Sequence, residues 1–81
     1  MITSEQIRGA RAMLRIEQSD LAARARVSLE TIKRIERKPG QISALAATLD
    51  AIRKALESAG VIFVVEENGE GPGVRLRKRP D

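Results

Sequence analysis

The residues whose chemistry stands out are cations gathered in one short stretch of the 81-residue chain. The segment from Arg24 to Lys38 holds six basic and two acidic residues, so its net charge of +4 equals the formal net charge of the entire chain. Guanidinium and ammonium groups donate hydrogen bonds to phosphate oxygens and to guanine O6 and N7, and a carboxylate accepts from cytosine N4. Clustered cations also attract a polyanion and release its condensed counterions. The stretch therefore predicts contact with a nucleic acid; a plain solvated face is the alternative interpretation.

Two short helices must position these cations. The first is expected over about residues 18–25, with an inner face of small and apolar side chains: Leu21, Ala22 and Ala25. The second is expected to begin after an N-cap at Ser28 and to run to about Arg37, with an apolar stripe at Leu29, Ile32 and Ile35. Only about three residues separate the two helices, which is the spacing of a helix-turn-helix unit. Its outward face carries Glu30, Lys33, Arg34 and Arg37.

The rest of the chain predicts two more helices and a hairpin. Thr3 and Gln6 fit a capping box for a helix over about residues 4–14. Ser43 is expected to cap a helix that ends at Gly60, with apolar positions at Leu45, Leu49, Ile52, Leu56 and Ala59. Strands are expected over residues 61–65 and 74–77, joined by the turn-rich residues 67–73. The fold class is thus an all-α bundle of four helices with a C-terminal β-hairpin. We divide it into a helix-turn-helix DNA-binding domain, residues 1–60 (motif 18–37), and a hairpin, residues 61–81.

Residue types that are missing exclude several kinds of chemistry. The chain has no Cys, His, Trp or Tyr. It therefore has no thiolate nucleophile, no Ser-His triad and no Cys or His metal ligand, and a domain of this size has little core left for a cavity. We expect neither an enzyme nor a cofactor or metal. The longest fully apolar run, residues 61–65, is far short of the ~20 residues that span a bilayer, so we expect a cytoplasmic protein without membrane contact.

The segment QSDLAARARVSLETIKRIER resembles the helix-turn-helix of the Cro-repressor-like (Xre) family of bacterial and phage transcriptional regulators. The resemblance extends from residue 1 to about residue 60. The segment AGVIFVVEENGEGPGVRLRK resembles the tail of a subgroup of small Xre regulators, some of them encoded beside toxin genes. The resemblance implies a lambda-repressor-like bundle of four or five helices whose members usually bind palindromic operators as dimers.

The resemblance also assigns roles to individual residues. Gln18 matches a residue that contacts the DNA backbone and sometimes a base, and Ser28 matches the residue that caps the recognition helix beside a phosphate. Positions that face the major groove are matched by Leu29, Glu30, Lys33 and Arg34. Arg11 and Glu36 match an Arg–Glu pair that joins the first helix to the third. Arg37 and Lys38 complete the expected DNA-binding set.

Two residues depart from the family pattern. Arg26 stands where glycine is common, so a non-glycine residue is expected to adopt a positive φ there. Glu17 stands where Ser or Thr often caps the helix, and this favours a helix start one residue later, near Ser19.

Each assignment has a plainer alternative. Glu30 has Arg34 and Arg26 four residues away on either side, and either pair would be worth only ~0.3–0.5 kcal/mol at the surface. Gln18 is alternatively an ordinary residue at the start of a helix. Arg11 and Glu36 are alternatively two separate surface charges. For Arg8 and Arg15 we favour surface charges over phosphate contacts.

The hairpin predicts a second copy of the chain. Its first strand is apolar on both faces, and an isolated two-stranded hairpin is marginal in water. We expect a homodimer that pairs its hairpins across a twofold axis through Val61, Ile62, Phe63, Val64, Val65, Val74 and Leu76. The alternative is that the chain covers its own strand. A twofold axis would place two recognition helices ~34 Å apart, one turn of DNA. For the tail cations we favour a role in solubility over DNA contact: Arg75, Arg77, Lys78 and Arg79.

The function expected from these observations is sequence-specific binding of double-stranded DNA. We expect a transcriptional regulator, a repressor that occupies a palindromic operator as a dimer. Two alternatives remain open: an antitoxin that also binds a toxin protein, and a protein-interaction module that does not bind DNA.

Overall fold

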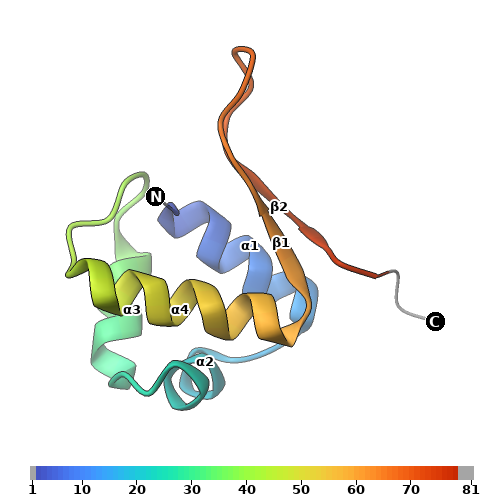
Figure 1. Ribbon diagram of the computed structural model, residues 1–81. Helices are drawn as coiled ribbons and strands as arrows, with labels where there is room; N and C mark the ends of the chain where they lie inside the picture. Colours follow the sequence, from blue (N-terminus) through green and yellow to red (C-terminus); the bar gives the residue numbers. More distant parts are fainter. Residues whose placement is uncertain (1, 79–81) are drawn as a thin grey trace.

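Four helices and one two-stranded antiparallel hairpin make up the fold. The computed structural model describes residues 2–78. The elements in chain order are α1 (Ser4–Leu14), α2 (Gln18–Ala25), α3 (Leu29–Arg37), α4 (Ala46–Ala59), β1 (Val61–Val64) and β2 (Gly73–Leu76). The hairpin starts against the helices and then projects well beyond them (Figure 1). A mostly helical bundle with a C-terminal hairpin is therefore confirmed; residues 79–81 of the expected hairpin segment lie outside the described part of the chain.

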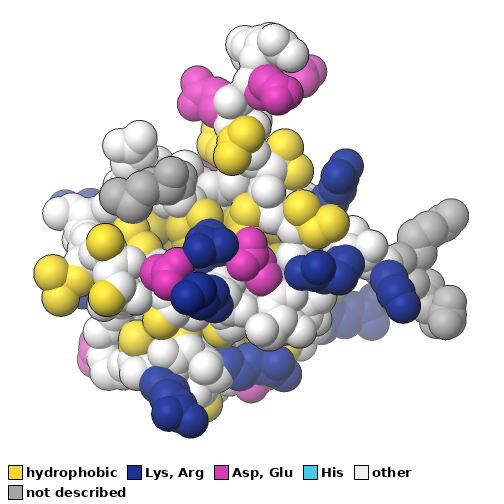
Figure 2. All heavy atoms as spheres, in the orientation of Figure 1, with side chains coloured by type: hydrophobic (Ala, Val, Ile, Leu, Met, Phe, Trp, Pro, Cys, Tyr) yellow, Lys and Arg dark blue, Asp and Glu magenta, His cyan; other side chains and the backbone are white. Residues whose placement is uncertain are grey.

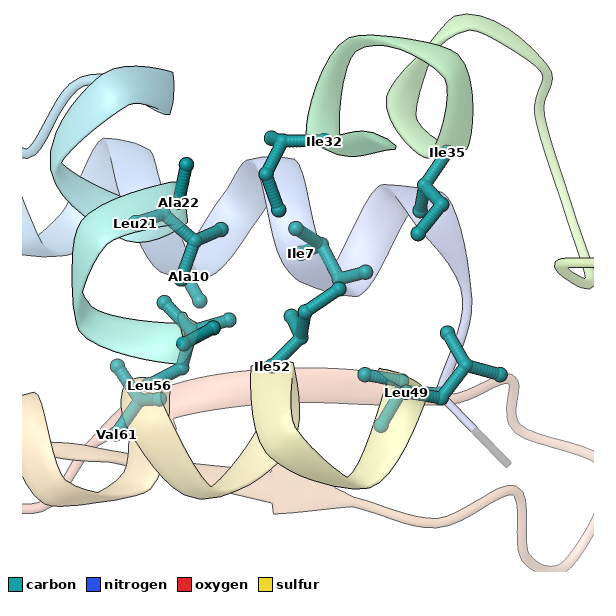
Figure 3. Packing of buried hydrophobic residues seen from close by; sticks show 12 residues of the cluster. Ile7, Ala10, Leu21, Ala22, Ile32, Ile35, Leu49, Ile52, Leu56 and Val61 are labelled. Carbon is teal, nitrogen blue, oxygen red and sulfur yellow. The ribbon is translucent and has the colours of Figure 1, made fainter. Parts of the chain in front are cut away.

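The core draws on every helix and on the first residue of β1. Its largest fully buried apolar side chains are Ile7, Leu21, Ile32, Ile52, Leu56 and Val61. Side chains of α3 and of α4 point toward one another across Ile7 of α1 (Figure 3). Complete burial of each such side chain contributes about 1.5–3 kcal/mol. Val61, one of the residues expected at a dimer contact, thus belongs to the core of its own chain.

The start of α1 follows its sequence signal. The Thr3 hydroxyl oxygen accepts from the Gln6 backbone N–H at 3.1 Å, and Gln6 Oε1 accepts from the Thr3 N–H at 2.8 Å, which is the expected capping box. The helix ends at Leu14, and its C-cap Arg15 has left-handed backbone angles, φ 58° and ψ 43°.

The start of α4 differs from the expectation. Its N-cap is Leu45, not Ser43, and Leu45 is 77% exposed instead of lying on the inner face. Upstream, Gln41 forms an isolated antiparallel bridge with Thr3. The backbone is still extended at Leu45, with φ −63° and ψ 139°, so the helix begins at Ala46. The end of α4 at Gly60, with φ 125°, is as expected.

The hairpin keeps one register from base to tip. Val61 pairs with Leu76 and Val64 with Gly73, and the same register reaches the isolated bridge between Glu67 and Glu70. The two residues between them have positive φ, 53° at Asn68 and 78° at Gly69, the requirement of a type I′ turn.

The hairpin is docked on α1. The Gln6 side chain donates to the carbonyl oxygens of Val64 at 3.2 Å and Gly73 at 2.8 Å, and so holds both strands. An ideal Cβ on Gly9 would come within 3.3 Å of Val74 Cγ1, so a glycine allows this close approach. The chain covers its own hairpin only in part: Ile62, Phe63, Val74 and Leu76 are half-buried, while Val64 and Val65 are 39% and 73% exposed.

Among residues 2–78, none of the helices has the length and apolar composition needed to cross a bilayer.

Candidate nucleic-acid interface

Helix α3 separates an apolar face from a charged one. Ser28 caps it by accepting from the Thr31 N–H at 3.1 Å. At 100° per residue, the residues expected to read DNA fall within an arc of roughly 140°: Leu29, Glu30, Lys33, Arg34 and Arg37. All of them are exposed, whereas Ile32 and Ile35 on the other side are buried. Ser28 and Lys38, which flank the helix, are exposed as well.

In the part of the chain that the structure describes, the cations of this face have no ionic partner. Within residues 2–78, none of the five ion pairs involves Lys33, Arg34, Arg37 or Lys38. Neither of the two surface pairs considered for Glu30 forms among these residues. Arg24 differs, because it pairs with Asp20 at 3.2 Å on the exposed side of α2. The charge on the outer side of α3 therefore remains available to an external anion.

An ion pair ties α3 to α1. Arg11 Nε and Nη2 donate to the two carboxylate oxygens of Glu36 at 2.7 and 2.6 Å, so the pair expected from the resemblance forms in bidentate geometry. The Glu36 side chain is only 4% exposed and that of Arg11 20%. The hydrogen bond to Glu36 raises the pKa of Arg11 above its usual value. Gln18 Nε2 donates to the same carboxylate at 3.1 Å, so α2 joins the cluster.

Three further hydrogen bonds fix the C-terminal end of α3. Arg8 Nη1 donates to the Glu36 carbonyl oxygen and Ser4 Oγ donates to the Lys38 carbonyl oxygen, both at 2.6 Å. The Glu5 carboxylate accepts from the Gly40 N–H at 2.9 Å, a bond that lowers the pKa of Glu5. These bonds leave α3 little freedom to rotate about its own axis.

A shallow hollow extends the cationic surface from α3 to α1. It is lined by Arg8, Arg11, Gln18, Lys33, Glu36 and Arg37. The only carboxylate in this set is already paired with Arg11. Arg8 was expected to be a surface charge, but it lines the same hollow as Lys33 and Arg37. The signal that would have found Arg8 is its spacing of three residues from Arg11 on one helix face.

The start of α2 and the turn between α2 and α3 can be compared with two expectations from the sequence. Gln18 is half-buried and starts α2 directly after Glu17, so the later start near Ser19 is wrong. Glu17 makes no side-chain capping bond, as its type suggested. Arg26 adopts φ 59°, the positive φ expected where glycine is common.

Comparison with protein-family models and with curated proteins found no match. In the described residues there is no group of three or more acidic side chains placed to hold a metal ion.

Proposed function

We propose that this protein binds double-stranded DNA sequence-specifically through α3 and represses transcription by occupying an operator. In this proposal α2, the turn at residues 26–28 and α3 form the helix-turn-helix of a lambda-repressor-like DNA-binding fold. One observation carries the proposal: α3 is held on its inner side, while the cations on its outer side form no ion pair within residues 2–78. A merely solvated face would need no such fixation of the helix behind it.

The exposed side chains divide into base contacts and phosphate contacts. In the major groove, Lys33 and Arg34 donate to guanine, Glu30 accepts from cytosine N4 and Leu29 packs on a thymine methyl group. Arg37 and Lys38 lie at the end of α3 and neutralise phosphates.

The start of α3 and the hollow beside it supply the remaining contacts. Ser28 places the N-terminus of the helix, with its partial positive charge, beside a phosphate. Gln18 uses its Nε2 to hold Glu36, so its Oε1 is left to accept from a base, while Arg8 reaches the backbone from α1.

The operator is expected to be palindromic. One chain presents one recognition helix of nine residues, which reads only a few base pairs. A twofold dimer supplies the second helix and doubles the contact. The hairpin is the dimerising element in this proposal, and neither a cofactor nor catalysis is involved.

The test begins with selection of bound duplexes from a random pool, followed by fluorescence anisotropy on the selected site. Lys33→Ala and Arg34→Ala should each weaken binding by about 1–3 kcal/mol, or roughly 5- to 150-fold, without moving the thermal midpoint. Lys54→Ala is the matched control, because Lys54 is an exposed cation on α4 whose pairing with Asp50 is at the surface. Affinity for random DNA should fall steeply as salt rises. Parent-like binding by both variants, or no binding at low salt, would refute the proposal.

A further inference from the structure

A groove runs beside the first strand of the hairpin. Its walls include Ile2, Leu49 and Arg53, and along the hairpin it touches the consecutive residues Phe63, Val64, Val65 and Glu66. Successive residues of a strand point to opposite faces. A groove that touches four in a row therefore meets the strand at its edge and not on one face. From the opposite side of the hairpin only Pro72 contributes.

The two edges of the hairpin differ in what they allow. In a two-stranded sheet each strand has one partner and one open edge. On the β2 side the sequence carries features that oppose strand addition: Gly71, Pro72, Gly73, Arg75, Arg77 and Lys78. The β1 side is an uninterrupted run, Val-Ile-Phe-Val-Val, with no proline, glycine or charge. An apolar open edge of this kind favours pairing with another strand.

Charge along the hairpin is segregated by its ends. Its carboxylates, Glu66, Glu67 and Glu70, are confined to the tip, where Figure 2 shows acidic side chains at the far end of the molecule. Its described cations lie at the base: Arg75 is within β2, and Arg77 and Lys78 come directly after it. Two hairpins aligned in parallel would bring both acidic tips together, whereas antiparallel alignment sets each tip toward the basic end of the partner.

A partner can cover the α4 wall of the groove without leaving a charged side chain unpaired. Arg53 donates to Asp50 at 2.6 Å and to Glu57 at 3.0 Å, and Lys54 lies 3.0 Å from Asp50. Figure 2 shows basic and acidic side chains side by side on this face, with hydrophobic side chains around them. Because these charges are satisfied within the chain, a partner laid over the groove leaves none of them unpaired.

We propose that a second copy of the chain docks its β1 antiparallel against this β1, forming a continuous four-stranded sheet β2-β1-β1-β2 across a twofold axis. The proposal deepens the dimer invoked under the proposed function by naming the edge and the direction. The axis passes near Val64 and Val65, because residues 61–63 are more deeply held in their own bundle.

Single cysteines test the edge, since the chain has none of its own. Directly opposed residues of an antiparallel pair have Cα atoms ~4.5–5.5 Å apart, within disulfide range. Val64→Cys or Val65→Cys should therefore form a covalent dimer on mild oxidation. Arg75→Cys, also at an exposed position but on β2, is the matched control and should stay monomeric on a non-reducing gel. Cross-linking of Arg75→Cys with neither β1 variant cross-linked would overturn the proposal.

Sedimentation velocity of the unmodified chain and of a tip variant tests the direction. The parent should be dimeric at about 100 µM, and Glu66→Gln/Glu67→Gln/Glu70→Gln should weaken the dimer about tenfold at low salt, as three surface pairs of ~0.2–1 kcal/mol allow. A monomeric parent, or a tip variant that dimerises more tightly, would overturn the antiparallel sheet. Neither experiment contains DNA, so their outcome is separate from that of the DNA-binding test.

Discussion

Replacing Glu36 by alanine tests how α3 is fixed to the bundle. The substitution removes the acceptor of Arg11 Nε, Arg11 Nη2 and Gln18 Nε2, and it leaves a guanidinium that is 20% exposed without its counter-charge. Loss of one partner of a buried pair costs about 3–5 kcal/mol. A chain of this length is stabilised by only ~4–12 kcal/mol in total. Glu36→Ala should therefore lower the thermal midpoint by at least ~12 °C.

A double-mutant cycle gives the test its sharpest form. Urea unfolding of Arg11→Ala, Glu36→Ala and the double variant should yield a coupling free energy of about 2–3 kcal/mol. The pair of Asp20 and Arg24 is the matched control, because it joins an acid to an arginine at 3.2 Å with both side chains nearly half exposed. Its coupling should stay below about 0.5 kcal/mol. If Glu36→Ala lost less than ~1 kcal/mol, or both cycles gave the same coupling, the account of how α3 is held would be refuted.

Other predictions concern the backbone, the pH dependence and the hairpin contact. Arg15→Gly should stabilise the fold by up to ~1 kcal/mol in urea unfolding, because φ is 58° at this position. Ala12→Gly, inside the same helix, should destabilise the fold by a similar amount. Changes of the same sign in the free energy of unfolding of the two variants would contradict this. The pKa of Asp50 is lowered from 3.8, chiefly by the hydrogen bond from Lys54, so its contribution to stability is present above that ordinary value and is lost as the pH falls through the lowered one. Thermal scans from pH 6 to pH 2 should show a smaller acid loss for Asp50→Asn than for the parent, and parallel curves would contradict the shift. Gln6→Glu keeps the oxygen that accepts from Thr3 but replaces the group that donates to two carbonyls by an acceptor. It should lower the free energy of unfolding by at least ~2 kcal/mol at pH 7, and by less near pH 4, where the new carboxyl is protonated. A loss of stability that does not depend on pH would exclude this cause.

Much of the fold was predictable because its signals are local. The capping box at Thr3 and Gln6 fixes the start of α1, and the apolar spacing with a capping Ser28 gives the bounds of α3. The positive φ of Arg26 was expected because glycine is common at this turn position in the family that the segment resembles. Each of these features depends only on residues within about one helical turn.

Contacts between segments that are distant in the sequence could not be predicted from such local signals. Ser4 donates to the Lys38 carbonyl oxygen and Arg8 donates to the Glu36 carbonyl oxygen. Because every residue type has a backbone carbonyl, the sequence does not indicate which carbonyl will accept. The start of α4 at Ala46 was not predicted either, because its N-cap Leu45 makes no side-chain capping bond that a sequence pattern could reveal. The burial of an apolar strand residue does not depend on its type alone, because helices of the same chain or a second copy can cover it equally well.

The Gln6 side chain caps α1 and also binds the hairpin, and this affects how the chain folds during synthesis. Its amide serves the opening turn of the first helix and also carbonyl groups 58 and 67 positions further on. A nascent chain can form α1 early, yet the surface of α1 on which the hairpin docks stays uncovered until Gly73 has been added and has left the ribosome. During that interval the newly made helices expose apolar surface, and the hairpin can cover α1 only after both of its strands have been made.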